Sequence, residues 1–156
     1  MKIVYLFFLT LLSVQNCANK MQESFPIAMT EVYHQHWVAG VRGGGSGTGF
    51  YITFEKELPS DIQLNQLYFR KGVAKMNKIS ETQYMFSFVG KANRERGNEI
   101  ITDDALPKET EIEAPFKIED NEAVLEYTQK GEKKYFKITN VKEKEMLAYP
   151  SARPRN

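Results

Sequence analysis

Two histidines, His34 and His36, are the only imidazoles in this chain of 156 residues. Side chains two residues apart on a β-strand point to the same face of the sheet, close enough to share a metal ion. A zinc site needs at least one further ligand, and we consider the carboxylates of Glu31 and of the Asp103–Asp104 pair for that role. Without such a ligand, two histidines on a half-exposed strand are ordinary surface residues, and both interpretations stay open.

A glycine-rich segment follows the histidines, and residues 38–49 hold six of the ten glycines. Such backbones can direct several N–H groups at an anion, but this spacing fits neither a nucleotide P-loop nor the dinucleotide-binding fingerprint. Ser46 lacks the G-x-S-x-G context of a hydrolase nucleophile, because residue 48 is Thr. We expect a flexible or bulged connection between two strands, with a recognition loop as the alternative. The residues of that recognition loop are Trp37, Arg42, Gly43, Gly44, Gly45 and Ser46.

No other residue pattern in the chain marks an active site. Serines and threonines are numerous, but none has a sequence context in which a neighbouring base would activate it. Nothing selects one pair of carboxylates for acid–base chemistry. We therefore expect a protein that is not an enzyme and needs no cofactor, and keep an enzyme of unknown reaction as an alternative.

The elements that must position these residues are short strands. From Thr30 onward, apolar and polar residues alternate with period two, and turn residues fill most intervals. The expected strands are residues 32–41, 50–54, 64–70, 73–78, 84–88, 123–128, 135–139 and 145–149. No stretch has the period of an amphipathic helix. This pattern predicts an all-β domain over residues 29–149, a single antiparallel β-sandwich or small barrel of seven or eight strands.

The best-marked element is a hairpin over residues 123–139. Ala123, Leu125 and Tyr127 alternate along its first arm, and the Lys130-Gly131 pair supplies a turn residue that tolerates positive φ. The opposite face of the hairpin carries Glu126, Lys133 and Lys137. Pairing of opposite charges across the two arms would contribute roughly a few tenths of a kcal/mol for each pair.

Charge is balanced over the chain but not along it. Residues 95–126 hold 11 acidic and 3 basic side chains, whereas residues 127–156 hold 3 acidic and 8 basic ones. A solvated acidic loop is the usual meaning of such a run, and residues 150–156 are expected to form a basic tail.

Residues 133–137 interleave lysines with aromatics, as nucleic-acid-binding strands do. Because the whole chain has 21 basic and 20 acidic groups, we expect no bulk attraction to nucleic acid.

The first 17 residues have the order of a secretion signal. Lys2 supplies the positive start, residues 3–12 form an apolar run too short to span a bilayer, and the sole cysteine, Cys17, follows where signal peptidase would cut. This arrangement resembles a bacterial lipoprotein signal, above all those of bacteroidete-type outer-membrane lipoproteins. The resemblance implies that residues 1–16 are removed and that Cys17 becomes an acylated N-terminus. A plain signal peptide and an uncleaved anchor are the alternatives.

The segment from Trp37 to Arg42, with the glycine run after it, is similar to a segment of small uncharacterised lipoproteins of the same bacteria. The resemblance to that family implies a cellular location and an architecture but no activity. Residues 17–28 would then tether the domain to the cell outer membrane, on its periplasmic or surface face, because several acyl chains anchor a protein stably.

These observations lead to two functional hypotheses. The first is a lipid-anchored, non-enzymatic binding or structural module whose partner is an envelope protein or a glycan, with no role for nucleic acid. The second is a periplasmic metal-binding protein that uses His34 and His36.

Overall fold

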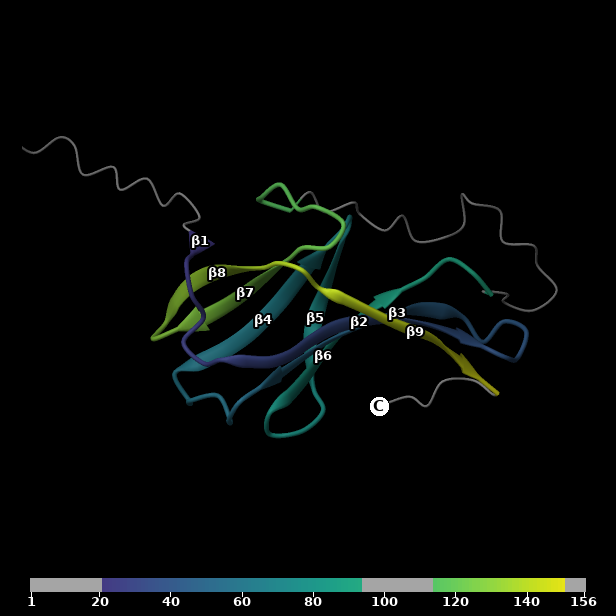
Figure 1. Ribbon diagram of the computed structural model, residues 1–156, viewed down its shortest axis with the longest axis horizontal. Coiled ribbons are helices and arrows are strands. Elements are labelled where there is room, and N and C mark those ends of the chain that lie inside the picture. Colours follow the sequence, from purple (N-terminus) through teal and green to yellow (C-terminus); the bar gives the residue numbers. More distant parts are fainter. Residues whose placement is uncertain (1–20, 94–113, 151–156) are drawn as a thin grey trace, which may run out of the picture.

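The computed structural model describes residues 21–93 and 114–150, which form nine strands and no helix (Figure 1). The strands are β1 (Met21–Gln22), β2 (Met29–Ala39), β3 (Ser46–Phe54), β4 (Ile62–Phe69), β5 (Gly72–Lys78), β6 (Gln83–Val89), β7 (Ala123–Gln129), β8 (Glu132–Ile138) and β9 (Lys142–Tyr149). The expected signal peptide, Cys17, the Asp103–Asp104 pair and residues 151–156 of the tail lie outside the described residues.

All nine strands belong to one open mixed sheet with the order β1-β8-β7-β4-β5-β6-β3-β2-β9. The pairs β1–β8 and β2–β9 are parallel, and the other pairs are antiparallel. The predicted all-β class is confirmed for the described residues, but the prediction of a purely antiparallel sheet is wrong. A sandwich or closed barrel is not confirmed, because β1 and β9 are the two edges of a single sheet.

The sheet is strongly curved, and the connection between β8 and β9 requires this curvature. β8 is second in the sheet and β9 is last, so in a flat sheet seven spacings of about 4.8 Å would put them about 34 Å apart. Only residues 139–141 join the two strands, and so short a connection spans about 14 Å at most. The sheet therefore curls until β9 can leave the end of β8 and pair with β2, as the yellow strand does in Figure 1.

The concave side of the sheet holds the main apolar core. Phe50, Ile52 and Phe54 of β3 point into it, and all three are 2% exposed or less. Their large side chains meet buried residues of the other half of the sheet, including Leu67, Phe69, Leu125 and Tyr127. Full burial of one such side chain stabilises the fold by about 1.5–3 kcal/mol.

A smaller apolar cluster covers the convex side of β4, β7 and β8. It consists of Tyr68, Val124 and Tyr135, with Met21, Val73, Ala114, Phe116 and Ile118 packed against them. Met21 lies in the segment expected to be a plain tether, yet it forms β1 and pairs with Tyr135. The folded domain thus begins earlier in the chain than residue 29.

The hairpin of β7 and β8 has the predicted core face and turn, but its outer face is covered as well, with Val124, Glu126 and Tyr135 0%, 4% and 6% exposed. Ala123, Leu125 and Tyr127 are 0%, 0% and 1% exposed. Lys130 and Gly131, which join the strands, have φ angles of 52° and 80°. Positive φ at both central residues is the geometry that matches the twist of a two-residue hairpin.

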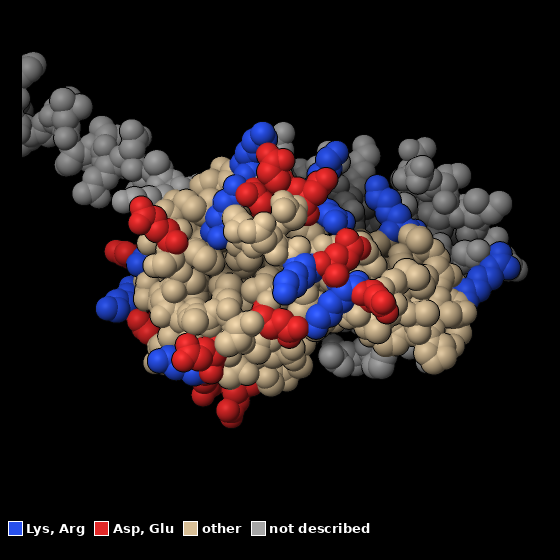
Figure 2. Space-filling model, in the orientation of Figure 1, with Lys and Arg blue, Asp and Glu red and all other residues tan. Residues whose placement is uncertain are grey.

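Charged side chains of both signs are interspersed on one face of the described residues. Figure 2 shows Lys and Arg next to Asp and Glu across the viewed face, with no large area of one sign. The exposed edge strand β9 contributes to this pattern, since Lys142, Glu143, Lys144 and Glu145 alternate in charge along it.

Candidate metal centre

The two histidines lie on β2 and point to its concave side, as their spacing predicts. His34 is 3% exposed and stands opposite Phe50 of β3, at the border of the apolar core. His36 lies one step nearer the solvent, with 39% of its side chain exposed. Their ring centroids are 5.7 Å apart. One imidazole is therefore fixed by the core and the other stands at the surface beside it.

The edge strand β9 supplies a carboxylate to this pair. The parallel register of β2 and β9 sets Glu143 opposite His34. Oε2 of Glu143 lies 3.8 Å from Nε2 of His34, and Oε1 lies 3.4 Å from Nε2 of His36. Three candidate ligand atoms, one from each residue, lie within 4.8 Å of one another.

These separations suit a small metal ion. With bonds of about 2.0–2.2 Å, the ligand atoms of a tetrahedral zinc site lie about 3.3–3.6 Å apart. The distances of 3.4 and 3.8 Å join the two imidazoles to different oxygens of Glu143, and the three candidate ligand atoms lie within 4.8 Å of one another. Side-chain movements of up to about 1–1.5 Å would bring the three atoms to that geometry. Two imidazoles and one carboxylate are a ligand set that zinc and copper accept, and three ligands leave a fourth position open.

A hydrogen bond from β3 orients the exposed imidazole. Oγ1 of Thr48 lies 2.8 Å from Nδ1 of His36, and the two residues are register partners on β3 and β2. In the tautomer with its proton on Nδ1, His36 donates to Thr48 and its Nε2 lone pair faces Glu143. Metal-binding histidines are commonly held in this way by a second hydrogen bond.

The buried imidazole is kept neutral by its surroundings. Burial lowers the pKa of His34 below its ordinary value of 6.5, and the positive charge of Arg70 acts in the same direction, while Glu143 opposes them. A neutral imidazole is the form that coordinates a metal ion. Among the described residues, Nδ1 of His34 is buried and has no hydrogen-bond partner. The ring is thus held by packing, with centroids 5.0 Å apart between His34 and Phe69.

The carboxylates considered from the sequence are not the ones found here. Glu31 lies on the opposite face of β2 and pairs with Lys144 at 2.7 Å, so its proposed role as a ligand is wrong. The Asp103–Asp104 pair lies outside the described residues. Glu143 was missed because it precedes the expected strand at residues 145–149 and because its pairing with β2 is parallel and distant in sequence. The alternation of basic and acidic residues over positions 142–145 could have indicated that this strand begins earlier.

The glycine-rich loop is a structured connection between β2 and β3. Gly43 and Gly45 have φ angles of 74° and 83°, which favour glycine. The Asn93 side chain accepts a hydrogen bond from the Gly43 N–H and donates to the carbonyl oxygens of Ala39 and Val41. The Gly45 N–H donates to the Asn93 carbonyl oxygen. These bonds occupy the backbone groups that an anion would need, so the loop is a hairpin connection fixed by Asn93.

The remaining residues of the proposed recognition loop lie on and beside the convex face of β2. Trp37 is half-buried and its indole lies over Gly47, where an added Cβ would be 2.7 Å from Nε1. Ser46 is buried and donates to the carbonyl oxygen of Ala92, and Gly44 donates to Val41 within the loop. Arg42 is exposed. A binding role for Trp37 and Arg42 stays a prediction.

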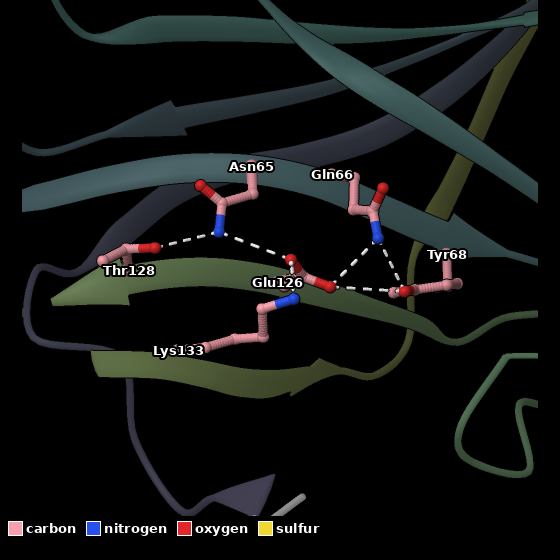
Figure 3. A network of polar contacts seen from close by, with 6 residues as sticks. All are labelled: Asn65, Gln66, Tyr68, Glu126, Thr128 and Lys133. Atoms are coloured by element: carbon pink, nitrogen blue, oxygen red, sulfur yellow. Dashed lines mark hydrogen bonds and ion pairs between the residues drawn. The ribbon is translucent and has the colours of Figure 1, made fainter. Parts of the chain in front are cut away.

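A second polar cluster surrounds Glu126 on the convex face of β7. Figure 3 shows its carboxylate between Asn65, Gln66 and Tyr68 of β4 and Lys133 of β8. Burial alone would raise the pKa of Glu126, but hydrogen bonds from Lys133, Gln66 and Tyr68 outweigh it and lower the pKa. Every carboxylate oxygen has partners, so this cluster is a satisfied structural network of the kind that fixes strand register.

Comparison of the chain with protein-family models, with curated proteins and with solved structures gives no match.

Proposed function

We propose that this protein binds a divalent transition-metal ion, zinc or copper, through His34, His36 and Glu143. The observation that carries the proposal is the convergence of these three side chains from two strands at distances of 3.4 and 3.8 Å. The buried position of His34 and the hydrogen bond between His36 and Thr48 support it, because both hold the imidazoles in place before the ion arrives.

Calorimetric titration with zinc tests this proposal. The chain is used without lipid and with Cys17→Ser, so that no thiol competes for the metal. We expect one zinc ion to bind per chain and the double variant His34→Ala, His36→Ala to give no heat above background. Glu31→Gln is the matched control, since Glu31 lies on β2 but faces away from the site. Equal heats from the parent and the double variant would overturn the proposal.

We further propose that the metal-binding domain is held at the outer membrane by acyl chains on Cys17. The apolar run before Cys17 supports this placement. Only residues 18–20 separate Cys17 from β1, so the lipid would hold the domain directly against the membrane surface. The intact mass of the native protein tests it: diacylglycerol and acyl additions on a chain that begins at Cys17 are expected. Native material without them would refute the anchor.

A second candidate function is binding of an envelope protein or a glycan on the convex face around Trp37. Trp37, Gly47 and Val89 are register partners in one row of the sheet, and Leu147 continues that row on β9. Val89 is 55% exposed and Leu147 38%, so the row presents apolar surface beside the indole. Trp37→Ala and Arg42→Ala should then abolish retention of the partner while leaving the fold intact. Retention by both folded variants would exclude this function.

A further inference from the structure

Phe69, the last residue of β4, connects the candidate metal centre to a cation. The centroid of its ring lies 5.0 Å from the centre of the His34 ring and 4.9 Å from the guanidinium carbon of Arg70. Because the two distances share one centroid, the guanidinium carbon lies within about 10 Å of the centre of the His34 ring. Arg70 thus stands at the same edge of the core as the metal ligands.

Arg70 has no acidic partner in the described part of the chain. It is exposed, and its guanidinium lies over the ring of Phe69. It occupies the turn between β4 and β5 with a φ of 53°, a region that non-glycine residues seldom adopt.

The charges at this edge do not balance once a metal is bound. A divalent ion brings two positive charges, and Glu143 is the one carboxylate among the three ligands. Arg70, which is exposed, adds a further positive charge. A loaded site therefore has excess positive charge and one open coordination position, which is the situation an anion relieves.

We propose that the metal-loaded protein binds a small oxyanion, a phosphate group or a carboxylate, between the metal ion and Arg70. This inference rests on the proposed metal site. One oxygen fills the fourth coordination position, and a second accepts hydrogen bonds from the guanidinium, whose fork of donors matches two oxygens. Such a bridge spans about 6 Å from metal to guanidinium carbon, and the metal lies about 3 Å from the centre of its histidine ring. Together they make about 9 Å, which is compatible with the upper limit of about 10 Å between the guanidinium carbon and the centre of the His34 ring.

Titration of the cobalt-loaded protein with inorganic phosphate tests this assignment, because the visible spectrum of the ion reports a change of ligand. The variant is Arg70→Asn, which removes the charge and tolerates the positive φ of this position. Lys71→Asn, in the same turn, is the matched control. We expect phosphate to change the spectrum of the parent and of the control equally, and to bind the Arg70 variant at least tenfold more weakly.

Two comparisons make the result specific. Acetate serves as the carboxylate probe, and chloride occupies one coordination position without reaching Arg70. Chloride should therefore bind the parent and the Arg70 variant alike, whereas phosphate or acetate should distinguish them. Equal binding of both oxyanions by parent and variant, or no spectral change with either, would overturn the proposal. Cobalt affinity is measured separately for each chain, so failure of the metal site itself is recognised by the absence of a cobalt spectrum.

Discussion

Replacement of Glu143 by Gln tests the metal centre through the stability of the fold. Gln keeps the size of the side chain but removes the charge of the ligand. We expect zinc affinity to fall roughly 100-fold, the upper end of the loss caused by removing an outer-shell partner of a metal ligand. At a zinc concentration of about 100 times Kd, an ion that binds only the folded chain stabilises it by about 2.7 kcal/mol. At that concentration the variant, with its weaker site, is stabilised by only about 0.4 kcal/mol.

These free energies correspond to measurable shifts in Tm. For a domain of this size 1 kcal/mol changes Tm by about 2–4 °C, so zinc should raise the Tm of the parent by about 5–11 °C and that of the variant by about 1–2 °C. Unfolding is followed by circular dichroism and by the fluorescence of the single tryptophan, with zinc and with a chelator. Without zinc, parent and variant should unfold at similar temperatures, because the Glu143 side chain is 56% exposed. Equal zinc shifts in both chains would refute the assignment of Glu143 as a ligand.

Three further changes have defined outcomes. Thr48→Val removes the hydroxyl 2.8 Å from Nδ1 of His36, so zinc affinity measured by calorimetry should fall about tenfold, and an unchanged affinity would show that this bond does not orient the ring. Glu126 has a pKa lowered from 4.5, so it stabilises the fold above that pH and loses this contribution as pH falls through the lower folded-state pKa. Denaturant titrations should show that Glu126→Gln removes this part of the pH dependence, and identical pH profiles would contradict the shift. Gly47→Ala puts a Cβ 2.5 Å from a backbone oxygen of β6 and 2.7 Å from Nε1 of Trp37, so overpacking should lower the free energy of unfolding by about 2 kcal/mol. A loss below about 0.5 kcal/mol would mean that the sheet shifts to make room.

Local features of the sequence were sufficient to predict all the strands except β1, at least in part, and the side of each that enters the main core. The alternation of Phe50, Ile52 and Phe54 with Tyr51 and Thr53 specifies which side of β3 enters the core, because side chains alternate with period two. The turn at residues 130–131 was also predictable from local sequence. A two-residue hairpin turn needs positive φ, and Gly131 adopts positive φ without steric cost. The shared face of His34 and His36 also follows from their spacing alone.

Pairings between distant segments were not predictable from one sequence. The parallel pairing of β2 with β9 joins residues more than one hundred positions apart, and it depends on the curvature of the whole sheet. This pairing brings Glu143 to the histidines, so the third ligand was missed along with the pairing. The hydrogen bonds of Asn93 across the glycine-rich loop were unpredictable for the same reason. They join distant segments, and no pattern within residues 38–49 indicates residue 93 as the partner.

X-ray absorption at the zinc edge of the loaded protein tests the central claim most directly. We expect scattering by two imidazole rings and one carboxylate, with bonds of about 2.0–2.2 Å, and a fourth light ligand from solvent or an oxyanion. The imidazole contribution should be halved by His34→Ala, which removes the buried ring from the site. A sulfur shell at about 2.3 Å, or a spectrum without imidazole scattering, would contradict the assignment of His34, His36 and Glu143 as the metal centre.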